Sequence, residues 1–363
     1  MKKKLLINIV VVCFWLTFLF FLQRLLLPKY MSEIHEGNMT EEYYKDKSSH
    51  DVIFIGDCEV FSNISPITLW EKYGITSYIR GSAQQLIWQS YYLLEDTLRY
   101  EKPKVVVFNV LAMKYNEPQK EAYNRLTLDG MKLSKSKINA IKASMTEEEA
   151  LITYIFPILR YHTRWNELSG EDFKYIMSKD KITHNGLLMR IDVKPVTTIP
   201  TGKKLADYQF GENSYDYLDR MTKLCKENDI ELILIKSPSV YPYWYEEWEQ
   251  QMVQYAKDND LKYFNFLDTA AEIGIDYNED TFDGGLHLNL SGAEKLSDYF
   301  GKILSESCQL MDHRNDLDLK KLWDEKTAFY YNMKEAQQNE LELYGYLKSY
   351  GAKAPSNDDT SIE

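Results

Sequence analysis

The sequence Asp51-Val-Ile-Phe-Ile-Gly-Asp-Cys58 contains four consecutive apolar residues, Val52 to Ile55, followed by Gly56. A continuous apolar run with β-branched members that ends at a glycine is typical of a buried strand in a parallel sheet. Ligands of such sheets gather at the carboxyl ends of the strands. We therefore expect Cys58 at a strand tip, where a nucleophile would lie. The alternative is a small, partly buried thiol in a strand-to-helix loop.

The rest of the chain alternates between strand and helix patterns. Strand patterns lie at 75–79, 104–110, 230–235 and 261–266, and helix patterns lie at 65–74, 84–100, 214–228, 245–259 and 290–305. This alternation predicts an α/β fold, a three-layer, doubly wound parallel sheet of the flavodoxin-like type. Residues 112–210 interrupt the alternation with helical stretches at 132–143 and 147–161 and an irregular region at 172–207. They predict a helical insertion that forms a cap or a partner-binding surface.

Composition excludes some classes of function. The chain has 363 residues and a formal net charge of -12, whereas non-specific nucleic-acid binding needs a basic surface. The four cysteines, at positions 13, 58, 225 and 308, lack the paired spacing of a disulfide framework or a zinc site. We expect no nucleic-acid partner, no metal and no cofactor.

The N-terminus has the pattern of a membrane span. Residues 5–27 are almost wholly apolar, and at about 1.5 Å per residue they are long enough to cross a hydrocarbon core of ~30 Å. Lys2, Lys3 and Lys4 precede this stretch and predict a cytoplasmic N-terminus. A cleaved signal peptide is the alternative, but no small-x-small cleavage site follows the apolar core. We expect a single-pass protein of the cell membrane with its main domain outside the cytoplasm.

The predicted organisation has four parts. A cytoplasmic stub and transmembrane anchor occupy 1–29, and a polar, charged stalk occupies 30–50. The α/β domain covers 51–310 and contains the insertion at 112–210. The C-terminal extension, 311–363, is expected to be helical over 317–350 and disordered from 354 onward.

A second stretch with chemical potential is Asp283-Gly-Gly-Leu-His287, between the last predicted strand and the last sheet-packing helix. A histidine at the carboxyl edge of the sheet would reach the tip of the first strand. A nearby carboxylate would orient its ring and stabilise its cation. Together with Cys58, these residues follow the order of a Cys-His-Asp site. The alternative for a histidine at a helix start is a capping or surface role.

These two stretches resemble blocks of the SGNH/GDSL hydrolase superfamily. Gly56-Asp57-Cys58 occupies the Gly-Asp-Ser block, and the stretch around His287 matches the last block. Gly81 corresponds to the glycine of the second block, and Asn109 to the asparagine of the third. The likeness covers 51–110 and 229–305. It is closest to the membrane-anchored branch that includes the alginate O-acetyltransferase proteins and the proteins that place D-alanine on lipoteichoic acid.

The resemblance implies a role for each matched residue. Cys58 would be the nucleophile, His287 the general base and Asp283 the acid that orients it. The backbone amides of Cys58 and Gly81, with the Asn109 side chain, would form the oxyanion hole. A membrane-bound O-acyltransferase partner is implied by the resemblance only.

Three departures from the family pattern bear on this assignment. Cys58 replaces the family's serine, Asp283 lies four residues before His287 where three is usual, and the third block lacks its glycine before Asn109. A cysteine is a competent acyl nucleophile, because its thiolate forms more readily than an alkoxide. The change therefore favours acyl transfer through a thioester. Loss of catalysis with a retained binding groove is the other interpretation.

Further polar residues are candidates for binding substrate: Asp57, Gln84, Arg160, His162, Arg164 and Lys236. The three in the insertion, Arg160, His162 and Arg164, would bind an anionic polymer or line the pocket mouth. Their alternative is an ordinary helix end, where basic side chains complement the dipole. Lys236, at a strand tip, would contact a phosphate or carboxylate, and its alternative is a snorkelling surface lysine.

The sequence thus leads to an SGNH-like α/β domain on an outward-facing anchor. The leading function is transfer of an acyl group, acetyl foremost, to or from an extracytoplasmic polysaccharide or other envelope polymer. An esterase that removes acyl groups is one alternative. A non-catalytic scaffold or binding protein of an envelope assembly is the other.

Overall fold

The computed structural model describes residues 2–29 and 39–350 of the chain. Within these residues the centre of the fold is a parallel sheet of five strands in the order β2-β1-β3-β4-β5. The strands are β1 (Val52–Gly56), β2 (Ser77–Gly81), β3 (Val105–Asn109), β4 (Glu231–Lys236) and β5 (Lys262–Asn265). This is the flavodoxin-like doubly wound order, and it confirms the predicted α/β fold class. The chain reverses its direction of winding between β1 and β3.

The central strands form where the sequence is continuously apolar. Every residue of β1 and β3 is buried, and the two strands pair with Val52 opposite Val105. Alternate side chains point to opposite faces, so Ile53 and Ile55 join one core cluster while Val52 and Phe54 join the other. Fully burying one such side chain stabilises the fold by roughly 1.5–3 kcal/mol. Both faces of the sheet are therefore interior and must be covered by helices.

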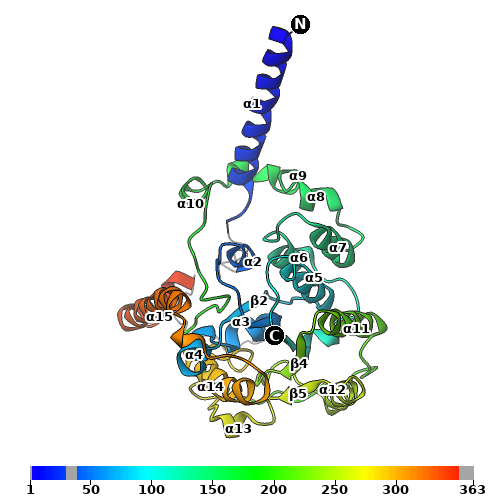
Figure 1. Ribbon diagram of the computed structural model, residues 1–363, viewed down its shortest axis with the longest axis vertical. Helices are drawn as coiled ribbons and strands as arrows, with labels where there is room; N and C mark the ends of the chain where they lie inside the picture. The colour runs from blue at the N-terminus through cyan, green and yellow to red at the C-terminus, as the bar shows by residue number, and fades with distance from the viewer. Residues whose placement is uncertain (1, 30–38, 351–363) are drawn as a thin grey trace.

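Helices cover both faces (Figure 1). One face is covered by α5 (Ile87–Thr97), α11 (Glu212–Glu227) and α12 (Glu246–Asp258). The other is covered by α3 (Cys58–Asn63), α4 (Pro66–Tyr73), α13 (Ala270–Ile273), α14 (Leu290–Ser307) and α15 (Leu317–Tyr344). Short 3-10 turns add η2 (Val110–Lys114), η4 (His313–Asn315) and η5 (Lys348–Tyr350).

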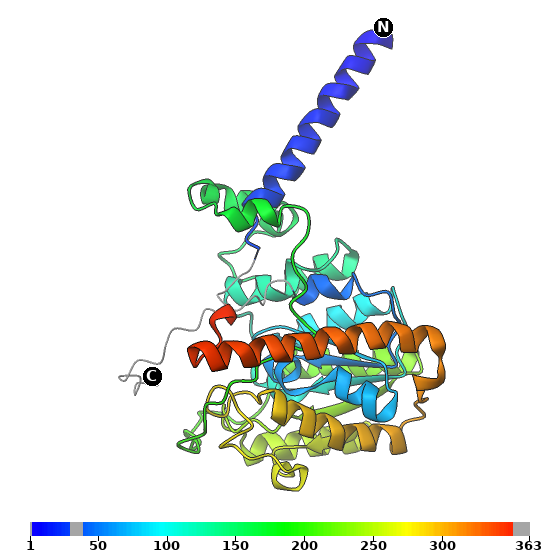
Figure 2. The same cartoon turned by 90° about the vertical axis from the view of Figure 1, so that its left-hand side faces the viewer.

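The C-terminal extension is part of this second layer. In α15, Trp323 is fully buried and stacks on Trp70 of α4, with ring centroids 5.0 Å apart. Figure 2 shows α15 lying lengthwise across the domain. Of the region predicted to be helical, 317–350, α15 covers 317–344 and packs on the core, and η5 follows at 348–350. The predicted disordered tail, from residue 354, lies outside the described residues.

The insertion at 112–210 contributes a group of short helices. They are α6 (Glu121–Leu128), α7 (Lys135–Ser144), α8 (Leu151–Ile155), α9 (Ile158–Tyr161), η3 (His162–Asn166) and α10 (Gly170–Lys174). The helix predicted over 147–161 is broken into α8 and α9. Pro157 lies at the break, since proline lacks a backbone donor and disfavours helical geometry in the residue before it. After α10 the chain returns to the sheet, where the Ile79 amide donates to the Asn185 carbonyl at 2.8 Å.

At the N-terminus, α1 (Lys2–Leu26) is long and apolar enough to cross a membrane, the one helix with this property in the parts of the chain that the structure describes. It projects away from the domain, and α8, α9 and α10 lie at its base (Figures 1 and 2). Residues 30–38 of the predicted stalk lie outside the described residues.

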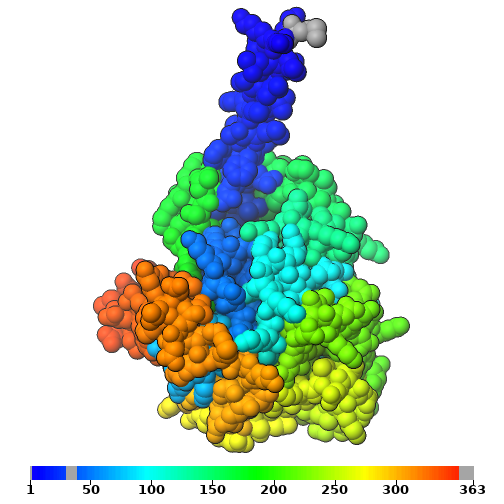
Figure 3. Space-filling view, in the orientation of Figure 1, coloured from blue at the N-terminus to red at the C-terminus, as the bar shows by residue number. Residues whose placement is uncertain are grey.

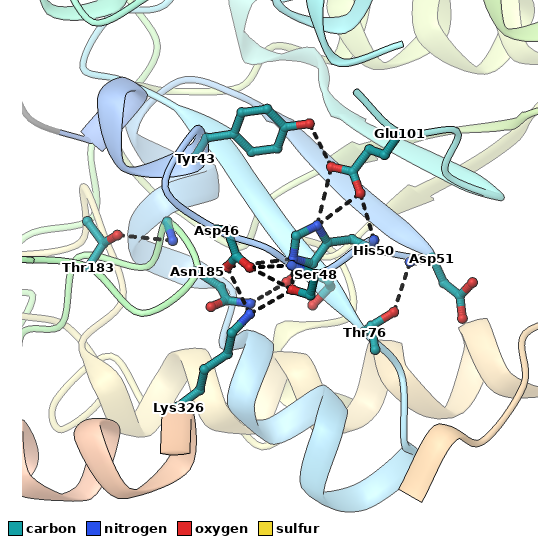
Figure 4. A network of polar contacts seen from close by, with 12 residues as sticks. Tyr43, Asp46, Ser48, His50, Asp51, Thr76, Glu101, Thr183, Asn185 and Lys326 are labelled. Atoms are coloured by element: carbon teal, nitrogen blue, oxygen red, sulfur yellow. Dashed lines mark hydrogen bonds and ion pairs between the residues drawn. The ribbon is translucent and has the colours of Figure 1, made fainter. Parts of the chain in front are cut away.

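The rest of the predicted stalk, 39–50, is folded into the domain, contrary to the expectation. It includes α2 (Met39–Tyr43), in which both Met39 and Tyr43 are buried. Buried polar contacts fix this segment (Figure 4). The Tyr43 hydroxyl donates to Glu101 at 2.6 Å, and Lys326 Nζ of α15 donates to Asp46 Oδ2 at 2.8 Å. The polar composition of this segment suggested a solvated stalk. A single sequence does not distinguish charged residues that form buried pairs from charged residues that face solvent.

We predict that Lys326→Met destabilises the protein by about 3 kcal/mol, because removing one partner of a buried pair leaves the other charge uncompensated. Burial opposes ionisation of Asp46, but Lys326 and His50 outweigh it and lower the pKa of this carboxyl. The stability that ionised Asp46 contributes is therefore fully present above the pKa of Asp46 in the unfolded chain, about 3.9. It is lost as pH falls toward the lower pKa of Asp46 in the folded protein. Urea unfolding of the full chain in detergent measures the loss. The control is Lys320→Met, whose pair with Asp324 is about half exposed and which should change stability by under ~1 kcal/mol.

Candidate active site

Cys58 lies at the carboxyl end of β1, at the first residue of α3. The turn between them needs Gly56, because a Cβ atom there would lie 2.5 Å from Val60 and 3.1 Å from the Asn109 Cβ. Asp57 caps α3, accepting the Glu59 amide at 3.1 Å. Cys58 is only partly buried, whereas its neighbours on both sides are fully buried. The local fold therefore presents this thiol at the winding reversal between β1 and β3.

A compact loop before α14 holds His287. The Asp283 carboxylate accepts from His287 twice: Oδ1 from the backbone amide at 2.9 Å, and Oδ2 from ring Nδ1 at 2.6 Å. Gly284 and Gly285 have φ of 82° and 102°, in the left-handed region that glycine adopts without strain. These two residues let the chain turn back, so that a carboxylate four positions earlier reaches the imidazole. The unusual spacing is thus compatible with an Asp-His pair.

The second ring nitrogen of His287, Nε2, is not engaged by Asp283. His287 Nε2 is buried and has no hydrogen-bond partner of good geometry among residues 2–29 and 39–350. Its ring stacks on Phe282, with centroids 5.5 Å apart and planes inclined by 11°. The thiol of Cys58 is near enough that each group shifts the pKa of the other. The structure therefore brings together the three residues predicted as nucleophile, base and acid.

A reactive cysteine would have a depressed thiol pKa, whereas the pKa of the Cys58 thiol is raised. Burial raises the pKa of the Cys58 thiol, and the neighbouring Asp57 and Glu59 add to the rise, while His287 opposes it. Burial acts to lower the pKa of His287, but a Cys58 thiolate and the Asp283 carboxylate together raise it well above its ordinary value. The imidazolium thus depends largely on a thiolate that burial disfavours. We take neutral thiol and neutral imidazole as the resting pair, with the proton moving to His287 when Cys58 reacts.

The predicted oxyanion-hole residues lie beside Cys58, but one of them is already engaged. Gly81 is opposite Gly56 in the sheet, so close that a Cβ on it would lie 3.1 Å from the Gly56 carbonyl oxygen. The Asn109 amide group donates to Asp57 at 3.1 Å and to Glu59 at 2.9 Å. Both of its hydrogens are used, so a role for Asn109 in an oxyanion hole requires one of these bonds to open.

Lys236 was predicted to bind substrate, and the structure corrects this. Its ammonium is fully buried, donating to both Glu59 oxygens at 2.9 and 3.1 Å and to the Ser237 carbonyl at 2.7 Å. The surface alternative is wrong for the same reason. Asp57 is likewise buried, and its oxygen accepts from the α3 amide and from Asn109 rather than facing a ligand. Burial and the Glu59 charge raise the pKa of Asp57 to about 6.

Two residues that sequence reasoning missed support the site. Glu59 joins Asn109 and Lys236 beneath Cys58. Asn63, at the end of α3, accepts the Leu288 amide at 2.8 Å and donates to Ser237 at 2.7 Å. It therefore ties the residue next to His287 to the helix that begins at Cys58. The sequence shows only that Asn63 lies about one and a half helical turns after Cys58. No sequence pattern connects Asn63 with Leu288.

The remaining candidates lie elsewhere. Arg160 pairs with Glu121 at 2.9 Å, the His162 ring contacts the Leu159 carbonyl, and Arg164 donates to the Leu26 carbonyl of α1 at 2.7 Å. All three lie at the base of α1, well separated from α3 in Figure 1, so they do not line the mouth of this site. Gln84 is half-buried in the loop after β2, and its role stays a prediction.

Comparison with known proteins gives only weak similarities. No protein-family model and no curated protein sequence matches the chain. Among solved structures, it is similar to a GDSL-like lipase from Bacteroides thetaiotaomicron, at 11% identity and a TM-score of 0.35, over 75% of this chain and 99% of that one. A protein assigned to the lipolytic G-D-S-L family from Desulfitobacterium hafniense gives 15% identity, a TM-score of 0.34 and coverages of 70% and 98%. A protein assigned as an acylhydrolase from Bacteroides fragilis gives 11% identity and a TM-score of 0.34, over 72% of this chain and 89% of that one. These values transfer no activity to this chain, so the functional argument depends on the site.

We predict that Lys236→Met destabilises the fold by about 3–5 kcal/mol, since it leaves the Glu59 carboxylate buried without its partner. Urea unfolding measures this loss. Lys262→Met is the matched control, because its pair with Glu231 is partly exposed and contributes under ~1 kcal/mol. A Lys236→Met protein as stable as the wild type would restore the ligand-binding interpretation.

We predict that iodoacetamide modifies Cys58 faster than Cys225 or Cys308, because Cys58 is partly exposed and the other two are buried. The rate should rise steeply with pH from 7 to 9, since the raised thiol pKa keeps the thiolate a minor species at neutral pH. Peptide mass spectrometry follows each site. His287→Ala should slow the reaction, because it removes the group that favours the thiolate. A rate that is already constant at pH 7 would instead indicate a resting thiolate-imidazolium pair.

Proposed function

We propose that this chain is an SGNH-like acyltransferase that moves an acyl group, acetyl foremost, to or from an extracytoplasmic polysaccharide. The observation that carries the proposal is the arrangement of the Asp283-His287 pair against Cys58 at the carboxyl edge of the sheet. In that arrangement, one ring nitrogen of His287 is fixed by a carboxylate and the other is available to the thiol. These are the geometric relations of a nucleophile, a base and an orienting acid.

The proposed reaction has two half-reactions. In the first, His287 Nε2 accepts the thiol proton as Cys58 Sγ attacks the ester carbonyl carbon. The tetrahedral intermediate then expels the donor's alkoxide, which takes that proton from His287 and leaves a thioester on Cys58. In the second, an acceptor hydroxyl loses its proton to His287 and attacks the thioester, returning the thiol. Because burial favours the neutral thiol, this general-base route needs no preformed thiolate.

The proposed oxyanion donors are the amides of Cys58 and Gly81, with Asn109 joining when it releases Asp57 or Glu59. Asp283 holds the base in one tautomer, with its proton on Nδ1, and stabilises the imidazolium formed during each attack. No metal or cofactor takes part in the proposed steps.

A carbohydrate acceptor is supported by an aromatic cavity of about 490 Å³ next to the site. Its walls include aromatic side chains, which stack on the apolar faces of sugar rings: Tyr115, Tyr241, Tyr243, Tyr245 and Trp248. Tyr115 in the cavity wall lies close enough to the nucleophile to feel its charge. Burial, followed by the charges of Asp57 and Cys58, raises the pKa of Tyr115 to about 12. Tyr241 connects the cavity to the loop that holds His287, because the Tyr241 backbone amide donates to the Gly285 carbonyl.

The proposed location is the outer face of the cell membrane, with α1 as a single-pass anchor whose N-terminus is cytoplasmic. The apolar length of α1 and the three lysines before it support this placement. A membrane-bound O-acyltransferase is the proposed source of acyl groups, since a domain outside the cytoplasm has no direct access to cytoplasmic activated acyl donors. With water as acceptor, the same site would act as an esterase.

A non-catalytic binding protein is the second candidate. The specific observation in its favour is the combination of a raised thiol pKa at Cys58 with an Asn109 amide that is fully engaged. On this alternative the aromatic cavity binds polymer, and Cys58 has no chemical role.

Acyl transfer predicts an acyl adduct on the Cys58 peptide when the full chain is incubated with an acetyl ester such as p-nitrophenyl acetate, detected by mass spectrometry. Cys58→Ala should abolish turnover, and His287→Ala should slow it by about 10²–10⁴-fold, the usual contribution of a general base. Cys58→Ser should retain part of the activity, because the base mechanism serves a hydroxyl as well. The control is Cys308→Ala, remote from the site. Turnover and polymer acylation that persist unchanged in Cys58→Ala would establish the binding-protein alternative.

A further inference from the structure

The helices at the base of α1 form a collar, which we define as residues 151–177, containing α8, α9, η3 and α10. The collar contacts α1 through polar bonds, two of them partly buried and one exposed. Arg24 of α1 donates to the carbonyls of Ile176 and Met177 at 2.5 and 2.7 Å, and Arg164 donates to the Leu26 carbonyl at 2.7 Å. The collar and the last turn of α1 are therefore one structural unit (Figure 3).

The collar exposes an unusual number of large apolar side chains. Between 48% and 72% of each of the following is exposed: Ile152, Phe156, Leu159, Trp165, Phe173 and Met177. The inward face of the collar packs on the domain: Tyr154 and Tyr161 are buried and lie against the Arg125 guanidinium. The short helices are thus amphipathic, and their outer face has no covering element in the parts of the chain described here. Large apolar side chains that gather on an exposed segment of this kind mark an interaction site.

The length of α1 identifies what covers this face. Every side chain from Lys2 to Phe21 is exposed, while Leu22 to Lys29 pack against the collar and the domain. The apolar free part, Leu5 to Phe21, measures about 26 Å at about 1.5 Å per residue. A hydrocarbon core is ~30 Å thick, so a spanning α1 must place its collar-contacting turn at the outer edge of that core. The collar then lies level with the lipid headgroups.

The chemistry of the collar suits that depth. Trp165, its most exposed large apolar side chain, is of the residue type enriched at membrane-water interfaces. The collar contains three basic and three acidic residues, in a chain of net charge -12. Its lack of net negative charge removes the repulsion from anionic headgroups that the rest of the domain would experience.

From these observations we propose that the collar is a lipid-binding surface, which inserts its apolar side chains into the outer leaflet around α1 and so fixes the orientation of the domain on the membrane. The ligand class is the phospholipid headgroup and acyl boundary, as for interfacial amphipathic helices. This inference rests on the proposed anchor, because it takes the depth of the collar from a membrane-spanning α1.

The test uses the full chain in two sets of phosphatidylcholine/phosphatidylglycerol vesicles, one with bromine on the acyl chains near the headgroup and one with bromine near the chain ends. Bromine quenches tryptophan on contact, so the first set probes the depth of the collar and the second the middle of the span. Trp15 lies within α1 and reports the anchor, whereas Trp165 reports the collar. The wild type, Trp15→Phe, and the double variant Trp15→Phe/Trp165→Phe are compared with the same proteins in non-brominated vesicles. Trp15→Phe/Trp244→Phe is the matched control, since Trp244 lies in the core, against Phe210 and Trp248.

We expect headgroup-level bromine to quench Trp15→Phe and the Trp244 control, and the double variant lacking Trp165 to lose that quenching. Quenching of the wild type by chain-end bromine, without quenching of Trp15→Phe by headgroup-level bromine, would leave the anchor intact and overturn the collar proposal. It would assign the apolar face to a protein partner instead. Absence of quenching of the wild type in both sets of vesicles would remove the anchor, and the collar proposal with it. Circular dichroism confirms that the variants remain folded.

Discussion

A buried ion pair between Lys236 and Glu59 joins the end of β4 to the first turn of α3, and the candidate site depends on it. Neither side chain is exposed, and Asn109 at the end of β3 completes the cluster. The carboxyl ends of three neighbouring strands, β1, β3 and β4, are thereby held in fixed relation. Separating these charges would leave one of them uncompensated in the core, so the arrangement is rigid. The backbone at Cys58, the residue before Glu59 and the first of α3, is held in place with the cluster.

The central sheet could be predicted from the sequence because its determinants are local. Runs such as Val52 to Ile55 and Val105 to Phe108 are continuously apolar, and this pattern specifies strands buried on both faces. The placement of His287 at the same edge of the sheet as Cys58 could also be predicted, since parallel strands end at one edge and the loop before α14 returns to it. The Asp283 contact requires only a four-residue loop with two glycines.

What could not be predicted depends on partners distant in sequence. Lys236 lies 177 positions from Glu59, and Arg164 lies 138 positions from the Leu26 carbonyl that it binds. A single sequence identifies the charge but not whether it is paired, so both residues were interpreted as contacts for a ligand. The break between α8 and α9 is different, because Pro157 was a local signal that the apolar periodicity of 147–161 obscured. The engaged Asn109 amide has no signal of any kind in the sequence.

The pairing of Asp46 with Lys326 has a consequence for biosynthesis on the proposed topology. Asp46 belongs to the segment that leaves the membrane first, whereas Lys326 is near the end of the described chain. Trp323 in the same helix covers α4, which follows the helix that begins at Cys58. The domain is therefore incomplete until almost the entire chain has been translocated. A growing or truncated chain would keep its second layer uncovered and Asp46 unpaired, which couples the formation of the candidate site to the end of export.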